Sequence, residues 1–304
     1  MDKIIDVYLI AGQSNAVGVA RVELLDEQYQ KTFPNVWLFN GGEGPREEHW
    51  HWVTVYPGQG SISSDVPMFG PELGMASVLQ KAHEPVAFIK YAYGGTAIYR
   101  NEDLNNRPEN HDNWHGPWDG VKSAYDLSEV DENTSGRLYT EFLMTIREGL
   151  AQLELKGFQP VIRGLTWMQG ETDGEIQFNN QKHQAASVYA HNLSCLFAAF
   201  RRDLSNITGQ DLHNLPIVFG EINRFSRCIC QAEAIVQAQL EVGRQPNNAL
   251  ILTEDLPIDT TLDEWHWNGN EEYFLGVRFG EKLLEVAKIS NSSSHKNFGL
   301  YSCE

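Results

Sequence analysis

The chain has 304 residues, of which 41% are hydrophobic and 21% are charged, values typical of a globular protein that can bury a substantial core. Its formal net charge of −18 at pH 7 disfavours binding to nucleic acid or to an anionic membrane surface. No stretch approaches the ~18 consecutive apolar residues of a transmembrane helix, and no basic leader precedes the first apolar run. We therefore see no signal peptide, which leaves open a cytoplasmic location, or a secreted or periplasmic one if a leader has been removed.

Apolar runs alternate with amphipathic segments along the chain, a pattern that predicts a parallel sheet with crossover helices. We expect long loops at Gly41–Asp65 and at Arg100–Gly136, and loops of that length are usually functional or disordered. No repeat or linker is visible, so we expect a single domain at residues 1–289 and a polar tail at 290–304. The strands are predicted at Ile5–Ala11, Val36–Phe39, Val86–Ala92, Val161–Met168, Leu215–Gly220 and Ala249–Thr253, and the helices at Pro71–His83, Leu138–Leu155, Gln181–Leu204, Gln231–Val242 and Glu271–Ala287.

Ser14 lies directly after the first predicted strand, in the turn Gly12-Gln13-Ser14-Asn15. Because a helix is expected to begin there, the serine hydroxyl would lie beside backbone N–H groups, the layout of an activated nucleophile. Position 16 is alanine, so the G-x-S-x-G elbow of the α/β-hydrolases is disfavoured.

Asp263 and His266 could supply the base that such a serine needs. An aspartate three residues before a histidine can reach its Nδ1–H and leave Nε2 free to accept the serine proton. The pattern is weak by itself, since the chain has ten histidines and His266 could equally pack near a helix cap. The four cysteines lack the paired spacing of a zinc site, and we expect free thiols.

Glycine and amide groups follow two other predicted strands. Gly94 and Gly95 follow the third strand, where a backbone N–H could point at a developing oxyanion, although a simple tight turn explains them as well. Gln169 follows the fourth strand, and its side-chain amide could also donate to an oxyanion. In an open parallel sheet the carboxyl ends of the strands meet at one edge, so these segments should converge.

The motifs GQSN, YAYGGTAI, WMQGETD and DEWH, together with FGPELGMA, occur in this order between Val7 and His266. They resemble the SGNH (GDSL-type) hydrolases, and more closely the carbohydrate-esterase branch that includes acetylxylan esterases and sialate O-acetylesterase-like proteins. The resemblance implies a flavodoxin-like three-layer α/β/α fold, no metal or other cofactor, and hydrolysis of acetyl esters on a carbohydrate such as xylan, sialic acid or a similar glycan.

By the same resemblance, Ser14 is the nucleophile, His266 the base and Asp263 the acid behind it. The oxyanion donors would be the N–H groups of Ser14 and Gly95 and the side chain of Gln169, a position where the wider superfamily has asparagine. Glu171 is an alternative acid, because a glutamate at the end of the fourth strand could also approach the histidine. Asp263 is favoured because the D-x-x-H spacing lets it reach His266 within one turn.

Substrate contacts are expected from Gln13, Gly94, Arg100 and Trp265, and at least one of the tryptophans that flank His266, Trp265 and Trp267, should shape the pocket wall. Two other functions compete with an esterase. One is a non-catalytic glycan-binding module on the same fold. The other is metal-dependent hydrolysis through His49 and His51, although H-x-H spacing alone is a weak metal signal. The oligomeric state and the natural glycan do not follow from the sequence.

Overall fold

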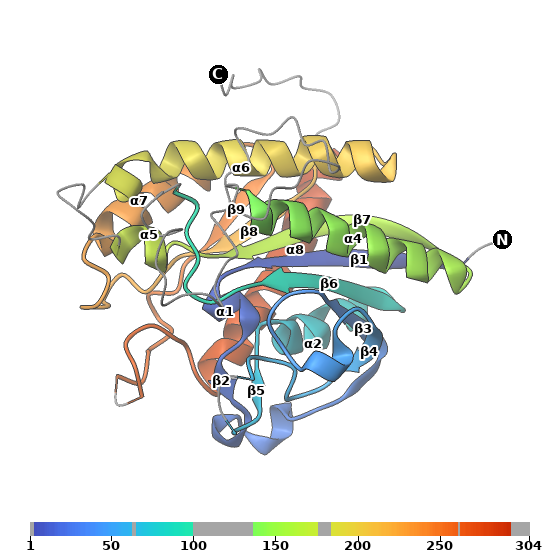
Figure 1. Cartoon of the computed structure of the whole chain (residues 1–304), viewed down its shortest axis with the longest axis horizontal. Helices are drawn as coiled ribbons and strands as arrows, with labels where there is room; N and C mark the ends of the chain where they lie inside the picture. Colours follow the sequence, from blue (N-terminus) through green and yellow to red (C-terminus); the bar gives the residue numbers. More distant parts are fainter. Residues whose placement is uncertain (1–2, 63–64, 100–135, 176–183, 261, 293–304) are drawn as a thin grey trace.

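The computed structural model describes residues 3–62, 65–99, 136–175, 184–260 and 262–292. A seven-stranded sheet crosses the molecule in the order β4-β3-β6-β1-β7-β8-β9 (Figure 1), and a second sheet pairs β2 with β5. The strands of the large sheet are β1 (Lys3–Gly12), β3 (Phe33–Asn40), β4 (Trp52–Val55), β6 (Val86–Ala92), β7 (Phe158–Met168), β8 (Ile217–Gly220) and β9 (Asn248–Ile251). The small sheet is made of β2 (Ala20–Arg21) and β5 (Met68–Phe69).

Helices lie between these strands and after the last of them. The α-helices are α1 (Ser14–Val17), α2 (Glu72–Ala82), α4 (Arg137–Leu155), α5 (Glu171–Glu175), α6 (Gln184–Thr208), α7 (Ala232–Val242) and α8 (Asn270–Ser292), and the short 3₁₀ helices are η1 (Val22–Leu24), η2 (Glu27–Tyr29) and η3 (Arg46–Glu48). No helix in the described ranges is long and apolar enough to span a bilayer.

β1 is the central strand, paired in parallel with β6 on one side and with β7 on the other. Residues 5–12 of β1 are all buried, which explains why this strand reads as an almost unbroken apolar run. Every other pair in the large sheet is also parallel except β3 with β4, which are antiparallel. The fold is therefore the expected α/β class, with an antiparallel strand at one edge.

Helices cover both faces of the sheet. Neighbouring residues of a strand point to opposite faces, and on β7 the ring of Trp167 meets Phe197 and Phe200 of α6. Met168 points the other way, toward Gly220 and the ring of Phe279 on α8. The sheet is thus the middle layer of three.

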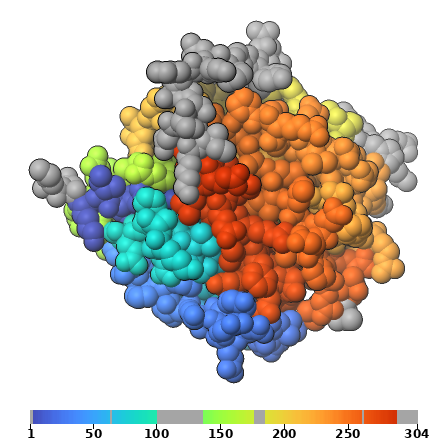
Figure 2. Space-filling view, turned by 180° about the vertical axis from the view of Figure 1, so that it is seen from behind, coloured from blue at the N-terminus to red at the C-terminus, as the bar shows by residue number. Residues whose placement is uncertain are grey.

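α2 and α8 pack against each other on the same face of the sheet. Figure 2 shows the cyan segment that contains α2 beside the red C-terminal helix. Their backbones approach closely at two glycines. A Cβ atom on Gly74 would lie 2.0 Å from the carbonyl oxygen of Tyr273, and one on Gly276 would lie 2.1 Å from that of Pro71. Glycine is therefore required at this helix crossing.

Three features differ from the sequence predictions. Residues Trp52–Val55 lie in the expected loop Gly41–Asp65 but form β4, which pairs with β3 at the edge of the sheet. The β2–β5 pair and the short helix α5 were not predicted, because two-residue strands and a five-residue helix carry no readable periodicity. Cys228 and Cys230 are free, but Cys195 is disulfide-bonded, so the prediction of free thiols is wrong for Cys195. Spacing alone cannot exclude a bridge between cysteines that are distant in sequence.

The three central strands end at the same level. In the parallel registers, Gly12 at the end of β1 lies opposite Ala92 of β6 and opposite Met168 of β7. The segments that follow these strands therefore begin side by side at the carboxyl edge of the sheet, where open parallel sheets bind ligands.

Candidate active site

Ser14 is the first residue of α1, directly after the β1 turn. Gly12 has φ +139°, and a Cβ atom there would lie 2.0 Å from the carbonyl oxygen of Met168, so only glycine fits. The N–H of Gln13 then donates to that same carbonyl at 2.8 Å. The turn is thus attached to the end of β7, and it presents Ser14 at the carboxyl edge of the sheet.

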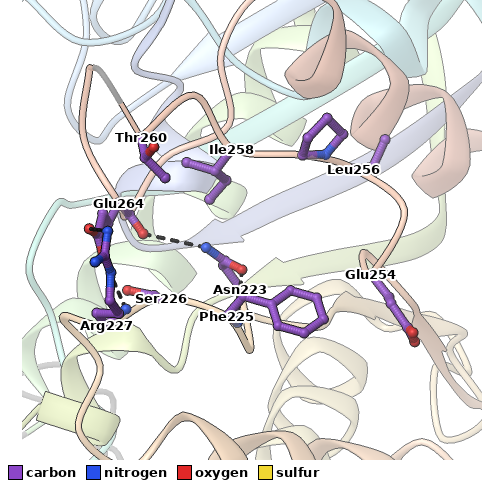
Figure 3. A pocket seen from close by; sticks show the side chains of 10 residues that line it. Asn223, Phe225, Ser226, Arg227, Glu254, Leu256, Ile258, Thr260 and Glu264 are labelled. Atoms are coloured by element: carbon purple, nitrogen blue, oxygen red, sulfur yellow. Dashed lines mark hydrogen bonds and ion pairs between the residues drawn. The ribbon is translucent and has the colours of Figure 1, made fainter.

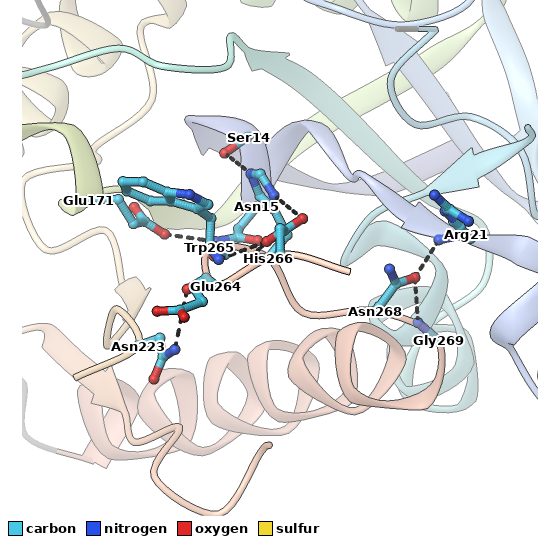
Figure 4. A network of polar contacts seen from close by, with 11 residues as sticks. Ser14, Asn15, Arg21, Glu171, Asn223, Glu264, Trp265, His266, Asn268 and Gly269 are labelled. Atoms are coloured by element: carbon cyan, nitrogen blue, oxygen red, sulfur yellow. Dashed lines mark hydrogen bonds and ion pairs between the residues drawn. The ribbon is translucent and has the colours of Figure 1, made fainter. Parts of the chain in front are cut away.

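The structure brings Ser14 and His266 together from the two ends of the chain (Figure 4), and Asp263 lies at the other nitrogen of the imidazole. The Oγ atom of Ser14 lies 2.9 Å from Nε2 of His266, and Nδ1 of His266 lies 3.0 Å from Oδ2 of Asp263. Both are hydrogen-bonding distances, and the histidine is half-buried between its two partners. With Nδ1–H donated to the carboxylate, Nε2 is left as the acceptor for the serine hydroxyl proton.

Asp263 also shapes the loop that carries the histidine. Its Oδ1 atom accepts the backbone N–H groups of Trp265 at 2.7 Å and of His266 at 2.8 Å. Partial burial acts to raise the pKa of Asp263, but the hydrogen bonds from His266 and from these N–H groups outweigh it and hold the pKa below its ordinary value. Asp263 is therefore ionised at neutral pH, as a group that stabilises an imidazolium must be.

The loop from residue 263 to residue 269 is tied to three other parts of the fold. Asn15 of α1 donates to the carbonyl oxygen of Trp265 at 3.1 Å, and Asn268 accepts the N–H of Arg21 at 2.7 Å. On its third side, the carboxylate of Glu264 accepts the N–H of Arg227 at 3.0 Å. These ties hold His266 in place from separate directions.

Glu171 lies beside the histidine loop but does not contact the imidazole through a hydrogen bond. Its Oε1 atom accepts the side-chain amide of Asn15 at 2.7 Å, and in the orientation that suits its neighbours the Gln13 amide donates to Oε2 at 3.3 Å. Burial raises the pKa of Glu171 above its ordinary value, against the lowering effects of the Asn15 hydrogen bond and of His266. Through Asn15, Glu171 braces both α1 and the histidine loop.

Two backbone N–H groups remain open beside the serine. A Cβ atom on Gly94 would lie 3.7 Å from the Cβ atom of Ser14, so the glycine turn after β6 is adjacent to the hydroxyl. Gly95 is exposed and has φ +66°. Within the described residues, the N–H groups of Ser14 and Gly95 make no hydrogen bond. Both could therefore donate to an anionic oxygen.

The Gln169 side chain, in contrast, has no N–H left for such an oxygen. Its Nε2 atom donates to the carbonyl oxygen of Thr96 at 3.0 Å and to Asp173 at 2.6 Å, and its Oε1 atom accepts from Tyr189 at 3.0 Å. The expected oxyanion role of this side chain is thus not supported, because the amide is fully buried and fully used. Burial raises the pKa of Asp173 to about 6 despite the N–H groups that it accepts. Gln169 and Asp173 instead fasten the segment after Gly95 to the end of β7.

Glu43 is a site residue that the sequence did not reveal. Its carboxylate accepts the N–H of Gly94 at 3.1 Å and the hydroxyl of Ser61 at 2.7 Å. It thereby fixes the glycine turn next to Ser14. An isolated glutamate within a long predicted loop gives no sequence signal for this role.

A buried ionic cluster supports α1 from beneath. Lys90 of β6 is completely buried, and its Nζ atom donates to the carbonyl oxygen of Val17 at 2.6 Å and to Glu72 at 2.8 Å. Glu272 of α8 is also buried, and its two oxygens have no hydrogen-bond partner in the described part of the chain. Burial, Glu72 and Glu171 raise the pKa of Glu272 well above its ordinary value, while Lys90 acts in the opposite direction. Glu272 thus lies beside the Lys90–Glu72 ion pair, in surroundings that favour the protonated form of its carboxyl group.

The other predicted contacts have varied outcomes. Gln13 is buried, so its side chain supports Glu171 and is not presented to solvent, whereas Trp265 is half-buried and directly precedes His266 in the loop (Figure 4). Trp267 is fully buried, with its indole N–H donated to Leu256. Arg100 lies outside the described residues. In the described ranges, no three histidine, cysteine, aspartate or glutamate side chains gather closely enough to hold a metal ion.

The chain folds as a mostly parallel sheet covered by helices on both faces, with polar groups at the carboxyl edge. Three solved structures share this fold. A protein from Arabidopsis thaliana is 18% identical (92% of this chain, 98% of that one, TM-score 0.63), and NanS is 15% identical (95% and 99%, TM-score 0.61). XAC1771, a carbohydrate acetylesterase from Xanthomonas citri, is 14% identical (93% and 57%, TM-score 0.56).

Residues 4–285 match the family described as carbohydrate esterase, sialic acid-specific acetylesterase, and the chain belongs to that family. It is accordingly a carboxylic ester hydrolase of the carbohydrate acetylesterase class. No curated protein matches the chain.

Proposed function

We propose that this protein removes O-acetyl groups from carbohydrate, with Ser14 as the nucleophile, His266 as the general base and Asp263 as the acid that orients the histidine. The observation that carries the proposal is the pair of contacts from Ser14 Oγ to His266 Nε2 at 2.9 Å and from His266 Nδ1 to Asp263 Oδ2 at 3.0 Å. Glu171 is 2% exposed and its carboxylate is engaged by Asn15, which supports a bracing role for it and favours Asp263 as the acid.

In the first half of the reaction, Ser14 Oγ attacks the acetyl carbonyl carbon while His266 Nε2 takes the hydroxyl proton. The tetrahedral oxyanion is stabilised by the open N–H groups of Ser14 and Gly95, because hydrogen-bond donors that are already in place stabilise the negative charge that develops on this oxygen. When the intermediate collapses, His266 returns the proton to the sugar oxygen, and the carbohydrate leaves with its hydroxyl restored. Ser14 then carries the acetyl group as an ester.

In the second half, water attacks the acetyl-serine. His266 accepts a proton from the water, the same two N–H groups stabilise the second oxyanion, and the proton returns to Ser14 as acetate leaves. Asp263 remains ionised throughout and stabilises the imidazolium in both halves. No step requires a cofactor.

Family membership supports an acetylated glycan as the substrate, with sialic acid and xylan as two candidates. The test is hydrolysis of a panel of acetylated glycans by the wild type and by Ser14→Ala, with acetyl and butyryl aryl esters as a chain-length series. We expect acetyl esters to be preferred and Ser14→Ala to lose activity by at least about 10³-fold. Unchanged hydrolysis by Ser14→Ala would refute the serine mechanism. Glycan binding without hydrolysis by the wild type would instead support a non-catalytic binding module.

A further inference from the structure

A cavity lies next to the histidine loop (residues 263–269), between the segment that follows β8 and the segment that follows β9. Its volume is about 250 Å³. Figure 3 shows side chains from both segments pointing into it, and we call it the Phe225 pocket after its most exposed ring. Its lining includes Asn223, Phe225, Arg227, Glu254, Ile258 and Glu264.

The Phe225 pocket shares a wall with the catalytic machinery proposed above. Glu264 lines the pocket and directly follows Asp263 in the chain. Its carboxylate is held by the N–H of Arg227 at 3.0 Å and by the guanidinium of Arg227 at 2.9 Å. The side chain of Asn223 lies 3.5 Å from the Glu264 carbonyl oxygen. This wall is therefore formed before any ligand arrives, and a ligand in the pocket would lie beside the loop that presents His266.

The lining combines an apolar surface with polar groups at its rim. Phe225 is 67% exposed in the described part of the chain, and Ile258 lies across from it (Figure 3). Asn223 and Glu254 add an amide and an exposed carboxylate. A sugar ring has a matching chemistry, because its C–H face can cover an aromatic ring while its hydroxyls hydrogen-bond to amides and carboxylates.

The net charge and the volume of the pocket restrict the kind of sugar that it can bind. The guanidinium of Arg227 is already paired with Glu264, so Glu254 leaves the pocket with a net negative charge. An anionic sugar would be repelled there, whereas a neutral sugar would not. The volume of about 250 Å³ is below the range of about 300–1,000 Å³ that is typical of sites for drug-sized ligands. A pocket of this volume suits one sugar ring and not a longer part of an oligosaccharide.

We propose that the Phe225 pocket is a subsite for a neutral sugar unit that belongs to the same glycan as the acetylated unit at Ser14. This inference rests on the proposed esterase function. The subsite would make the enzyme favour an acetylated oligosaccharide over the matching acetylated monosaccharide, because only the longer substrate can reach both places.

The test compares Phe225→Ala with the wild type on acetylated oligosaccharides of xylose, mannose, glucose and galactose and on the matching acetylated methyl monosaccharides. We expect KM on at least one oligosaccharide series to rise by about tenfold in Phe225→Ala, which corresponds to about 1.4 kcal/mol, with kcat nearly unchanged. The ratio of oligosaccharide KM to monosaccharide KM should rise accordingly. Phe225→Trp should restore the lower ratio, since it keeps an aromatic face. Leu155→Ala, which truncates a side chain that is 88% exposed at the end of α4, is the matched control and should leave both KM values unchanged.

Titration of the unacetylated oligosaccharides into the Ser14→Ala variant, with and without Phe225→Ala, tests the sugar subsite separately from the proposed esterase function. Binding that Phe225→Ala weakens supports the subsite even if the wild type hydrolyses no acetyl ester. An unchanged KM ratio together with unchanged binding in Phe225→Ala would overturn the subsite and leave the esterase intact. Tighter binding of sialylated than of neutral oligosaccharides at Phe225 would overturn the assignment to a neutral sugar.

Discussion

Asp263 does two things with a single carboxylate, since one oxygen holds the imidazole and the other accepts two backbone N–H groups of the same loop. Asn at this position could keep the backbone contacts through its carbonyl oxygen, but its NH₂ group would face Nδ1 of His266. The histidine would then present the wrong tautomer to Ser14. These backbone contacts fix the Asp263 side chain, which explains how an aspartate only three residues before His266 can direct its carboxylate at Nδ1.

Asp263→Asn is therefore expected to lower kcat on an acetyl ester by about 10³- to 10⁴-fold while the protein stays folded. Glu171→Gln is the comparison, because it keeps an acceptor for Asn15 and should cost far less. Steady-state kinetics and thermal melting of the two variants check this. A larger loss of kcat in Glu171→Gln would move the triad acid to Glu171.

Glu272 gives a pH dependence of stability whose sign can be stated. Its folded-state pKa lies above the value of 4.5 for a free glutamate, so the unfolded chain loses this proton first as pH rises. The contribution of the group to the free energy of unfolding is complete below about pH 4.5 and is lost as pH rises through the folded-state pKa. The stability of the wild type should therefore fall above pH 4.5 relative to a variant that cannot ionise here.

Glu272→Gln is that variant, and it has nearly the same shape as the neutral carboxyl group. Urea unfolding at a series of pH values from 4.5 to 8 should show the variant gaining stability relative to the wild type as pH rises. A stability difference that does not vary with pH would show that Glu272 has an ordinary pKa in the folded protein.

At the scale of elements, the turn between β1 and α1 depends on a glycine that packs against β7. Gly12 combines a positive φ with a Cβ position 2.0 Å from the Met168 carbonyl oxygen, whereas Gly157 has φ +82° and open space around its Cβ position. Gly157→Ala should thus cost only the backbone strain of about 1–2 kcal/mol. Gly12→Ala should cost clearly more, and it should also lower kcat by displacing Ser14. Equal losses of unfolding free energy in the two variants would contradict this account of the turn.

The ion pair beneath α1 joins β6, α2 and α1. Lys90→Met leaves the Glu72 carboxylate buried without its partner, and loss of one member of a buried pair typically costs about 3–5 kcal/mol. The double variant Lys90→Met/Glu72→Gln removes both charges and keeps an acceptor for the N–H of Gly70. Denaturant unfolding should show the double variant to be more stable than Lys90→Met. A double variant that is less stable than Lys90→Met would mean that the charge of Glu72 is not the source of the loss.

At the scale of the whole molecule, the fold class followed from the sequence because buried parallel strands and amphipathic helices have distinct periods. The prediction for Val86–Ala92 matches β6 at both ends, and Val161–Met168 ends where β7 ends. The order of strands did not follow, because it depends on pairing between segments far apart in the chain. Edge strand β4 was missed for a related reason, since its pairing with β3 gives no alternation that stands out from an aromatic loop.

The candidate site was predictable to the extent that its chemistry is local in sequence. Ser14 and the Asp263–His266 pair stand in short motifs, and the structure brings them within hydrogen-bonding distance. Glu43 and Glu272 act through tertiary contacts and leave no local pattern. For Gln169, the residue type suggested a free donor, but only the tertiary structure reveals that Thr96 and Asp173 take both of its N–H groups.

The proposed mechanism requires that Ser14 forms an acetyl-enzyme during hydrolysis of a carbohydrate acetyl ester. The direct measurement is to quench the wild-type enzyme rapidly during turnover of an acetylated glycan, digest it and locate the acetyl group by mass spectrometry of the peptides. We predict that the acetyl group is found on Ser14 and disappears as substrate is exhausted, and that no peptide is acetylated in Ser14→Ala. An acetyl group on another residue during turnover would contradict this mechanism. So would the absence of acetyl-Ser14 together with an active Ser14→Ala variant.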